Sequence, residues 1–322
     1  MSSHDVLADR RLQYARMFLD RGDGEAALSL ADEALELAPD WDAAHFLKGE
    51  ILEILGRAAE AADCFTRYLA LAGEDRMGGE VRLALLGRAP VPDVLPATYV
   101  EALFDDYAGR FDRALLTGLE YRAPMLLRDL VDRHAPDDGT RLRLLDLGCG
   151  TGLGGEAFRD RAGWLRGIDL SASMLAEARR KGIYDELAQD DVLASSPAAM
   201  APVDLVLAAD VLVYIGDLAP VFAAIRPAMK PGGLFAFSVQ AGQGADFELK
   251  RECRYGHNTG YIARLAELSG FEVLAIEDAV CRREAGQDVP GALVLLRRPL
   301  LEVIDAIAPF AGIVPLPRRL EN

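Results

Sequence analysis

The chain is short of positive charge and of long apolar runs. Its 322 residues carry 35 Lys and Arg against 51 Asp and Glu, a formal net charge of -16 at pH 7. Residues 1–98 and 99–322 share this deficit equally, at -8 each. Binding to nucleic-acid phosphates or to anionic lipid needs concentrated Lys and Arg, so both kinds of partner are disfavoured. No run approaches ~18 apolar residues, so no membrane-spanning helix is expected.

Cysteine is also scarce. The four cysteines form no C-x-x-C pair and lie in separate predicted elements: Cys64, Cys149, Cys253 and Cys281. The sequence therefore predicts neither a metal site nor a disulfide framework, and the compartment is expected to be reducing. The charged N-terminal residues are not followed by the apolar stretch of a signal peptide, so we expect a cytoplasmic protein.

The most informative segment is Leu144–Gly152, an apolar run that ends in Asp146. Three glycines then stand at alternate positions: Gly148, Gly150 and Gly152. Glycines after a strand let the backbone turn sharply and bring its N–H groups against a ligand, where a Cβ would collide. A helix predicted over residues 152–159 directs its partial positive charge to the same point. The segment predicts a nucleotide-type cofactor site in a doubly wound α/β domain.

Two cofactors compete for this segment. A dinucleotide fingerprint G-x-G-x-x-G can be aligned on Gly150, Gly152 and Gly155, and Asp169 lies about 20 residues on, where a ribose-binding acid belongs. Counted from the end of the strand, however, the first tight-turn glycine is Gly148, which places the third motif glycine on Leu153. An NAD(P)-binding oxidoreductase remains the alternative.

The segment resembles motif I of class I S-adenosylmethionine-dependent methyltransferases, in which an acid near the strand end precedes G-x-G-x-G. The resemblance implies that S-adenosyl-L-methionine is the cofactor and that Asp146 lies by its methionine amino group. A pyrophosphate beside the same acid would be repelled, which is why Asp146 discriminates between the two cofactors.

Further segments match the same family. A second apolar run ends in Asp169, whose carboxylate can accept hydrogen bonds from both ribose hydroxyls. Leu170, the next residue, is also predicted to contact the cofactor. Residues 171–179 open a helix with a serine at the N-cap and resemble the family segment D-x-S-x-x-M-L-x-x-A. The resemblance places Asp191 near the adenine amino group, and Asp190 is an equally placed neighbour.

The acceptor region is expected beyond the next strand. Residues 203–210 form a near-continuous apolar run that predicts a buried parallel strand. Asp210 emerges at its carboxyl end, the edge where open α/β sheets bind ligands, so Asp210, Leu212 and Tyr214 are predicted near the cofactor methyl group and the acceptor. A cap on the following helix is the other interpretation of Asp210.

A catalytic base is needed for a phenol or an amine but not for a carboxylate acceptor. His257 is the best candidate because its unperturbed pKa is ~6.5; a capping or surface histidine is the alternative. Arg282 and Arg283 lie in a polar insert between two runs that suit terminal antiparallel strands. They are predicted either to hold an anionic acceptor or to be solvated charges.

Residues 99–112 precede the sheet and predict a helix with an aromatic face. Three aromatic residues are spaced along it by three and four: Phe104, Tyr107 and Phe111. Core packing is one interpretation. The family resemblance implies a lid over the cofactor instead, and it assigns Tyr107, Tyr121 and Arg122 to the cofactor site.

The first 75 residues repeat with a shift of 34 positions, which aligns Gly22 with Gly56 and Ala27 with Ala61. This period and the small-residue positions resemble tetratricopeptide repeats. Such repeats imply a groove for a protein partner; a structural module or a dimer contact is the alternative.

The sequence therefore predicts three parts. Residues 1–98 form a small all-α, tetratricopeptide-repeat-like module and linker, 99–298 a Rossmann-like, seven-stranded α/β methyltransferase domain, and 299–322 a C-terminal tail. The expected reaction is in-line transfer of a methyl group from S-adenosylmethionine to oxygen or nitrogen of a small organic or carrier-linked acceptor. A repeat scaffold with a catalytically silent cofactor domain is a further alternative.

Overall fold

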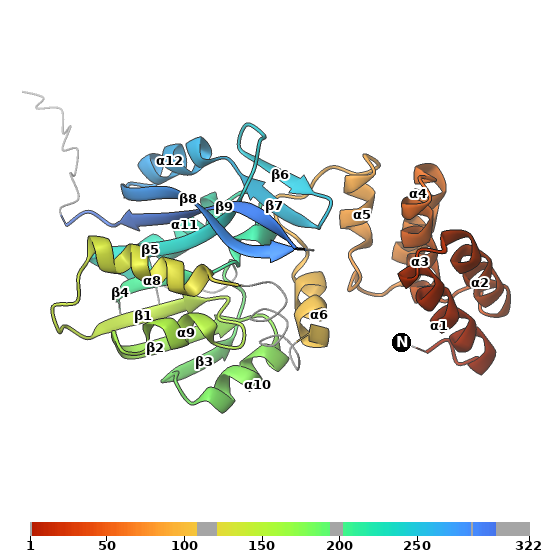
Figure 1. The fold of residues 1–322 in the computed structure, drawn as a ribbon, viewed down its shortest axis with the longest axis horizontal. Helices are drawn as coiled ribbons and strands as arrows, with labels where there is room; N and C mark the ends of the chain where they lie inside the picture. Colours follow the sequence, from red (N-terminus) through yellow and green to blue (C-terminus); the bar gives the residue numbers. More distant parts are fainter. Residues whose placement is uncertain (1, 108–120, 194–201, 285, 301–322) are drawn as a thin grey trace, which may run out of the picture.

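The computed structural model describes residues 2–107, 121–193, 202–284 and 286–300. Figure 1 shows a group of N-terminal helices beside a larger α/β part built on one mixed sheet. The expected Rossmann-like α/β class is confirmed for the larger part. Within the described ranges, no helix has both the length and the apolar character needed to cross a membrane.

The N-terminal part consists of two helix pairs and one shorter helix: α1 (Val6–Asp20), α2 (Gly24–Leu37), α3 (Asp42–Ile54), α4 (Ala58–Leu71) and α5 (Gly79–Leu85). Each helix packs on the next one along the chain. Gly22 and Gly56, which are 34 residues apart, occupy the turn inside each pair, both with positive φ. The close approach of α3 and α4 needs a small residue, because a Cβ on Gly49 would lie 2.6 Å from the ring of Phe65. The 34-residue spacing therefore recurs in the turns of the folded chain.

Helix α5 and helix α6 (Ala97–Tyr107) connect these helices to the sheet. Val81 of α5 and Val100 of α6 are buried in one apolar cluster with Tyr255 from the α/β part. The intervening segment is held by backbone pairing, since the Leu95 N–H donates to the Tyr214 carbonyl at 3.0 Å. The predicted linker is thus part of the packed structure.

The main sheet contains β1 (Leu142–Leu147), β2 (Ala162–Asp169), β3 (Glu186–Gln189), β4 (Val203–Ala208), β5 (Met229–Ala241), β8 (Glu272–Glu284) and β9 (Gln287–Arg297). Their order is β3-β2-β1-β4-β5-β9-β8; the first five are parallel, and β9 runs antiparallel to both β5 and β8. A hairpin of β6 (Phe247–Lys250) and β7 (Arg254–His257) joins the end of β5. The sequence predicted seven strands; the described chain has nine, because this hairpin was not recognised.

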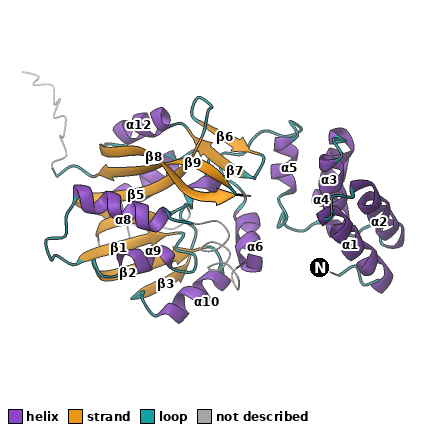
Figure 2. Cartoon of the chain, viewed as in Figure 1, coloured by secondary structure: helices purple, strands orange, loops and turns teal. Residues whose placement is uncertain are grey.

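Helices cover both faces of the sheet (Figure 2). Helices α8 (Ala123–His134) and α9 (Leu153–Phe158) pack on one face, and α11 (Ala219–Ile225) and α12 (Thr259–Leu268) pack on the other. Leu144 and Leu145 are adjacent in β1, and each is fully buried in a different one of these two cores. This two-sided burial explains the unbroken apolar runs in the sequence. Helix α10 (Ala172–Lys181) contacts α6, the edge strand β3 and its neighbour β2. Short 3-10 turns lie at Leu212–Tyr214 and Arg226–Ala228.

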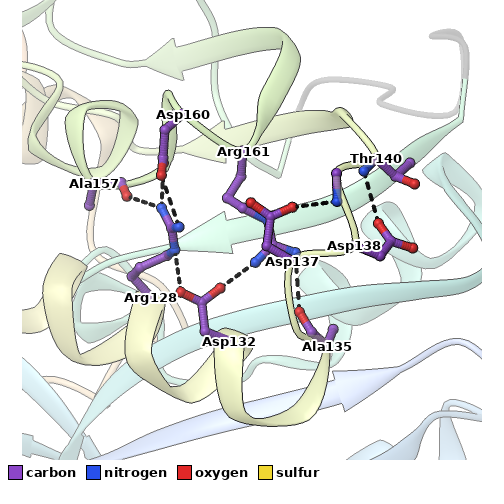
Figure 3. Close-up of polar contacts among 10 residues, drawn as sticks. Arg128, Asp132, Ala135, Asp137, Asp138, Thr140, Ala157, Asp160 and Arg161 are labelled. Carbon is purple, nitrogen blue, oxygen red and sulfur yellow. Dashed lines mark hydrogen bonds and ion pairs between the residues drawn. The ribbon is translucent and has the colours of Figure 1, made fainter.

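A charged network fixes α8 against the turn before β2 (Figure 3). The Arg128 guanidinium donates to Asp132 at 2.7 Å and to Asp160 at 3.0 Å. Arg161 is only 3% exposed, pairs with the same Asp132 and donates to the Ala135 carbonyl at 3.1 Å. These contacts hold α8 in place beside β1 and β2.

Candidate active site

A cavity of about 220 Å³ lies at the carboxyl ends of the parallel strands. Its walls come from the loops after β1 to β4, from α6 and the segment before it, and from single residues of β7 and β8. This is the edge at which open α/β sheets bind ligands.

The loop after β1 lines one end of the cavity. The three alternating glycines all adopt positive φ, at 59° for Gly148, 53° for Gly150 and 97° for Gly152. A Cβ on Gly148 would lie 2.3 Å from a methyl carbon of Val211, so the turn packs directly against the loop after β4. Gly148 and Gly150 line the cavity, whereas a Cβ on Gly152 would meet the ring of Tyr184 instead.

Asp146 faces the cavity from the end of β1 and is almost fully buried. The Tyr184 hydroxyl donates to its Oδ2 at 2.6 Å. Burial raises the pKa of Asp146 to about 7, and the hydrogen bond from Tyr184 opposes this rise because it favours the ionised carboxylate. No motif in the sequence indicated Tyr184.

Asp169 ends β2 and also lines the cavity. Its Oδ2 accepts the Gly150 N–H and its Oδ1 accepts the Ser171 N–H, both at 2.8 Å. Burial raises the pKa of Asp169, and these two N–H donors act in the opposite direction. A carboxylate offers about four lone-pair sites, so further hydrogen bonds can be accepted. Ser171 caps α10 as predicted, since its Oγ accepts the Met174 N–H at 3.0 Å.

The loop after β3 contributes two more acids. Asp190 and Asp191 both line the cavity, next to Leu170 from the loop after β2. The Asp191 carboxylate accepts the Leu193 N–H at 2.8 Å, and the Asp190 carboxylate accepts the Asp191 N–H at 2.9 Å. Position on the wall does not separate the two candidates that the sequence left open.

The opposite end of the cavity holds Asp210, directly after β4. It is a non-glycine residue with φ of 59°, an uncommon conformation that recurs at functional sites. Its N–H donates to Ser238 Oγ at 2.8 Å, and its Oδ1 lies 2.6 Å from Nη1 of Arg282. Burial raises the pKa of Asp210, and the Arg282 charge opposes this rise. Among the described residues, no group engages Oδ2 of this carboxylate.

Arg282 lies within β8 and not in the polar insert that the sequence predicted. It is buried on the cavity wall, and each of its three nitrogens donates: Nη1 to Asp210, Nη2 to Gln240 at 2.8 Å, and Nε to Glu284 at 3.0 Å. Arg283 is not a cavity residue, because successive side chains of a strand point to opposite faces; it pairs with Asp288 at 3.0 Å near the surface.

Arg254 was missed by the sequence analysis. It begins β7, lines the cavity and pairs with Glu284, which thereby links it to Arg282. Tyr214 lines the same wall, and burial raises its pKa while Arg254 opposes the rise. Residues 254–257 show no strict alternation of polar and apolar residues, so the sequence carried little signal for this strand.

Of the remaining predicted site residues, some line the cavity and others do not. Tyr121 lines the cavity, and its hydroxyl donates to the Ala209 carbonyl at 3.3 Å. Arg122 lies outside the cavity wall, where it donates to the Val280 carbonyl at 3.3 Å. Leu212 is buried in the core. Tyr107 ends α6, but its side chain, like all of Phe111, lies outside the described residues; Phe104 of the same helix does line the cavity.

His257 requires a correction. It is 1% exposed and does not belong to the cavity wall; its Nε2 faces the carbonyl oxygens of Ile215 at 2.9 Å and Gly216 at 3.1 Å. Burial lowers its pKa to about 4, so the ring is neutral at pH 7. The predicted role as catalytic base is not supported, because β7 directs this side chain into the protein and Arg254 toward the cavity.

The charges on the wall fit a cationic ligand. The lining contains two arginines, Arg254 and Arg282, and five aspartates: Asp146, Asp169, Asp190, Asp191 and Asp210. A sulfonium and an ammonium are favoured in such a cavity, and a pyrophosphate is repelled. The predominantly negative charge of the cavity wall therefore fits S-adenosylmethionine better than a dinucleotide.

Comparison with known proteins decides the family. A methyltransferase-domain family model matches residues 145–237. A ubiquinone biosynthesis O-methyltransferase of Thiobacillus denitrificans is 31% identical over 196 residues, which cover 56% of this chain and 78% of that relative. The chain belongs to the class I S-adenosylmethionine-dependent methyltransferases. The cofactor prediction is thereby confirmed, and the dinucleotide alternative is not supported.

Other similarities to this methyltransferase are shorter or more distant. A malonyl-[acyl-carrier protein] O-methyltransferase of Enterobacter lignolyticus is 37% identical over 99 residues, 31% of this chain and only 39% of that relative. The structure of the [4+2]-cyclase SpnF superimposes with a TM-score of 0.54 at 18% identity, over 65% of this chain and 98% of that one. A 1,6-didemethyltoxoflavin-N1-methyltransferase of Burkholderia thailandensis gives 0.50 at 19% identity, over 66% and 94%. These two structures share the fold.

Proposed function

We propose that this methyltransferase methylates an oxygen atom of a small or carrier-linked hydroxyl acceptor. The observation that carries the proposal is the single cavity that joins the strand-end acids Asp146 and Asp169 to a second, ion-paired carboxylate, Asp210. The curated relatives named O-methyltransferases support transfer to oxygen. The relative named for a malonyl carrier protein supports a carrier-linked acceptor, but the free oxygen group of malonyl is a carboxylate, so support for a hydroxyl comes from the cavity wall.

The cofactor would occupy the end formed by the loops after β1, β2 and β3. In this assignment Asp146 receives the ammonium group of the methionine part, Asp169 receives the ribose hydroxyls, and Asp191 lies at the adenine amino group. Gly148 and Gly150 let the backbone approach the ligand closely. Leu170 supplies apolar contact on the adenosine side.

When bound, S-adenosylmethionine supplies an electrophilic methyl group on a sulfonium, ready for in-line displacement. The protein then has to align the acceptor, exclude water and remove one proton. We assign the proton to Oδ2 of Asp210, with Arg282 holding the carboxylate in place. The apolar wall formed by Leu95, Val100 and Phe104 keeps water out.

A hydroxyl acceptor fits this wall better than a carboxylate. Binding of an anionic acceptor was one of the two roles predicted for Arg282, yet each nitrogen of that side chain already donates a hydrogen bond within the protein. A carboxylate acceptor would also meet the negative charge of Asp210 at close range.

We further propose that residues 1–98 are a tetratricopeptide-repeat module that presents the catalytic part, residues 99–298, to a protein partner. The recurring turn glycines and helix pairs support this interpretation. The charge of -8 over residues 1–98 disfavours an acidic partner on this module.

The first test is calorimetry with S-adenosylhomocysteine, with NAD and NADP titrated in parallel. We expect micromolar binding of the sulfur ligand alone. Binding of a nicotinamide nucleotide alone would overturn the proposal.

The second test compares methylation of catechol with methylation of benzoate, using labelled cofactor. We expect the hydroxyl compound to be preferred and Asp210→Asn to lower kcat by about 10²-fold, because a positioned base contributes roughly that factor. The same variant keeps its affinity for S-adenosylhomocysteine. Preference for benzoate, with kcat unaffected by Asp210→Asn, would show that the acceptor is a carboxylate.

A further inference from the structure

Tyr184 occupies a niche made by three glycines behind the cofactor loop. The residue lies in the turn between α10 and β3. A Cβ on Gly152, Gly155 or Gly167 would approach its ring atoms to 3.0, 2.5 and 2.9 Å. A Cβ on Gly155 or Gly167 would overlap the phenol and one on Gly152 would crowd it, so part of the glycine pattern that suggested a nucleotide site accommodates a tyrosine.

Packing against these glycines directs the hydroxyl of Tyr184 toward a single hydrogen-bond acceptor, the carboxylate of Asp146. That hydroxyl donates to Asp146 Oδ2 at 2.6 Å. Asp146 lines the cavity, whereas Tyr184 does not, so any effect of Tyr184 on a ligand passes through the carboxylate.

Asp146 depends on few groups for its charge. In the described part of the chain, the Tyr184 hydroxyl and the Gly155 backbone are the groups that favour its ionised form. Three further titratable groups face it: Asp169, which disfavours ionisation, and Cys149 and Tyr121, whose own pKa values the Asp146 charge raises. Removing the phenol hydroxyl would leave the Gly155 backbone as the remaining described group that favours the ionised form of this buried carboxylate.

We propose that Tyr184 is a positioning residue that keeps Asp146 ionised and directed at the ammonium group of the cofactor's amino-acid part. This inference rests on the proposed orientation of the cofactor. It assigns Gly155, the third glycine of the apparent dinucleotide fingerprint, to the packing of a phenol ring and not to phosphate binding.

The test is calorimetry on the full chain with two ligands. S-Adenosylhomocysteine carries the ammonium group, and 5′-methylthioadenosine lacks the amino-acid part. We expect Tyr184→Phe to weaken S-adenosylhomocysteine about tenfold and to change the affinity for 5′-methylthioadenosine by less than about twofold. Tyr261→Phe is the matched control, since Tyr261 donates to Asp217 at 2.9 Å away from the cavity; it should change neither affinity.

A pH series separates positioning from simple packing. Loss of the hydrogen bond raises the pKa of Asp146 further, so the variant loses the charged carboxylate at a higher pH than the wild type. The ratio of the two Kd values for S-adenosylhomocysteine is therefore larger near about pH 7 than near about pH 8.5. Ionisation of the ligand itself cancels in this ratio.

Gly155→Ala provides a second route, because its Cβ would displace the phenol without removing it. We expect the same selective loss. Equal binding of S-adenosylhomocysteine by the wild type and Tyr184→Phe would overturn the inference and leave the proposed function standing, as would an equal loss for both ligands. Failure of the wild-type protein to bind S-adenosylhomocysteine would overturn the proposed function itself.

Discussion

The two ends of the cavity are built in different ways. At the cofactor end, the acids lie at the ends of three strands that follow one another along the chain, and backbone N–H groups hold Asp169 and Asp191, two of them from residues two positions further on. At the acceptor end, Asp210 and Arg254 are connected through side chains of β8, and Tyr121 comes from a distant segment. The first end follows from local sequence, whereas the second exists only once the whole sheet has formed.

The largest effect is expected from breaking the acceptor end. Arg282→Met leaves the largely buried Asp210 carboxylate without the cation that it pairs with, whereas Glu284 keeps its pairing with Arg254. Losing one partner of a buried pair costs about 3–5 kcal/mol. Urea denaturation should show this loss in the free energy of unfolding. Below the new midpoint, the cofactor end should still bind S-adenosylhomocysteine.

Arg297→Met is the control for that experiment. Arg297 pairs with Glu272 at 2.7 Å, but both side chains are about half exposed, so the change should cost no more than about 1 kcal/mol. Equal effects of the two substitutions would show that the buried network contributes no special stability.

The next effect concerns the cofactor end alone. Asp169→Ala removes hydrogen bonds to a charged acceptor, worth about 1.5–3 kcal/mol, so S-adenosylhomocysteine should bind about 10- to 100-fold more weakly. Circular dichroism should show an intact fold. Calorimetry gives the affinity directly.

Asp185→Ala is the matched control for Asp169→Ala. Asp185 also accepts a backbone N–H, from Leu165 at 2.8 Å, but it does not line the cavity. Unchanged affinity in Asp169→Ala, or an equal loss in Asp185→Ala, would contradict the ribose assignment.

This difference between the ends explains what the sequence could predict. Asp146 and Asp169 follow apolar runs directly, and parallel strands place their carboxyl ends at one edge, so both acids were located before the structure was known. Ser171 was recognised as a cap for the same local reason.

No comparable sequence pattern located the residues of the acceptor end. Arg282 was expected in an insert because β8 continues past its apolar part, and only pairing with β9 shows that residue 282 lies in a strand. The β6–β7 hairpin went unrecognised, so His257 seemed available and Arg254 was overlooked. The cofactor end also contains one contact that the sequence did not indicate, the hydrogen bond between Tyr184 and Asp146, because these residues lie 38 positions apart.

The smallest effect on the site is expected from a substitution of His257, because this residue belongs to neither end of the cavity. His257→Gln should leave the affinity for S-adenosylhomocysteine within about twofold, because the ring does not line the cavity and the amide can still donate to the carbonyls of Ile215 and Gly216.

The substitution should instead change how the free energy of unfolding depends on pH. Burial lowers the folded-state pKa to about 4, below the unfolded value of ~6.5, so the unfolded chain binds the extra proton first. The histidine therefore destabilises the fold progressively as pH falls from about 6.5 toward 4, by roughly 1–2 kcal/mol near pH 5, and the variant should lack this part of the slope. Denaturation at several pH values measures it; a slope unchanged by the substitution would mean that His257 is not buried in its neutral form.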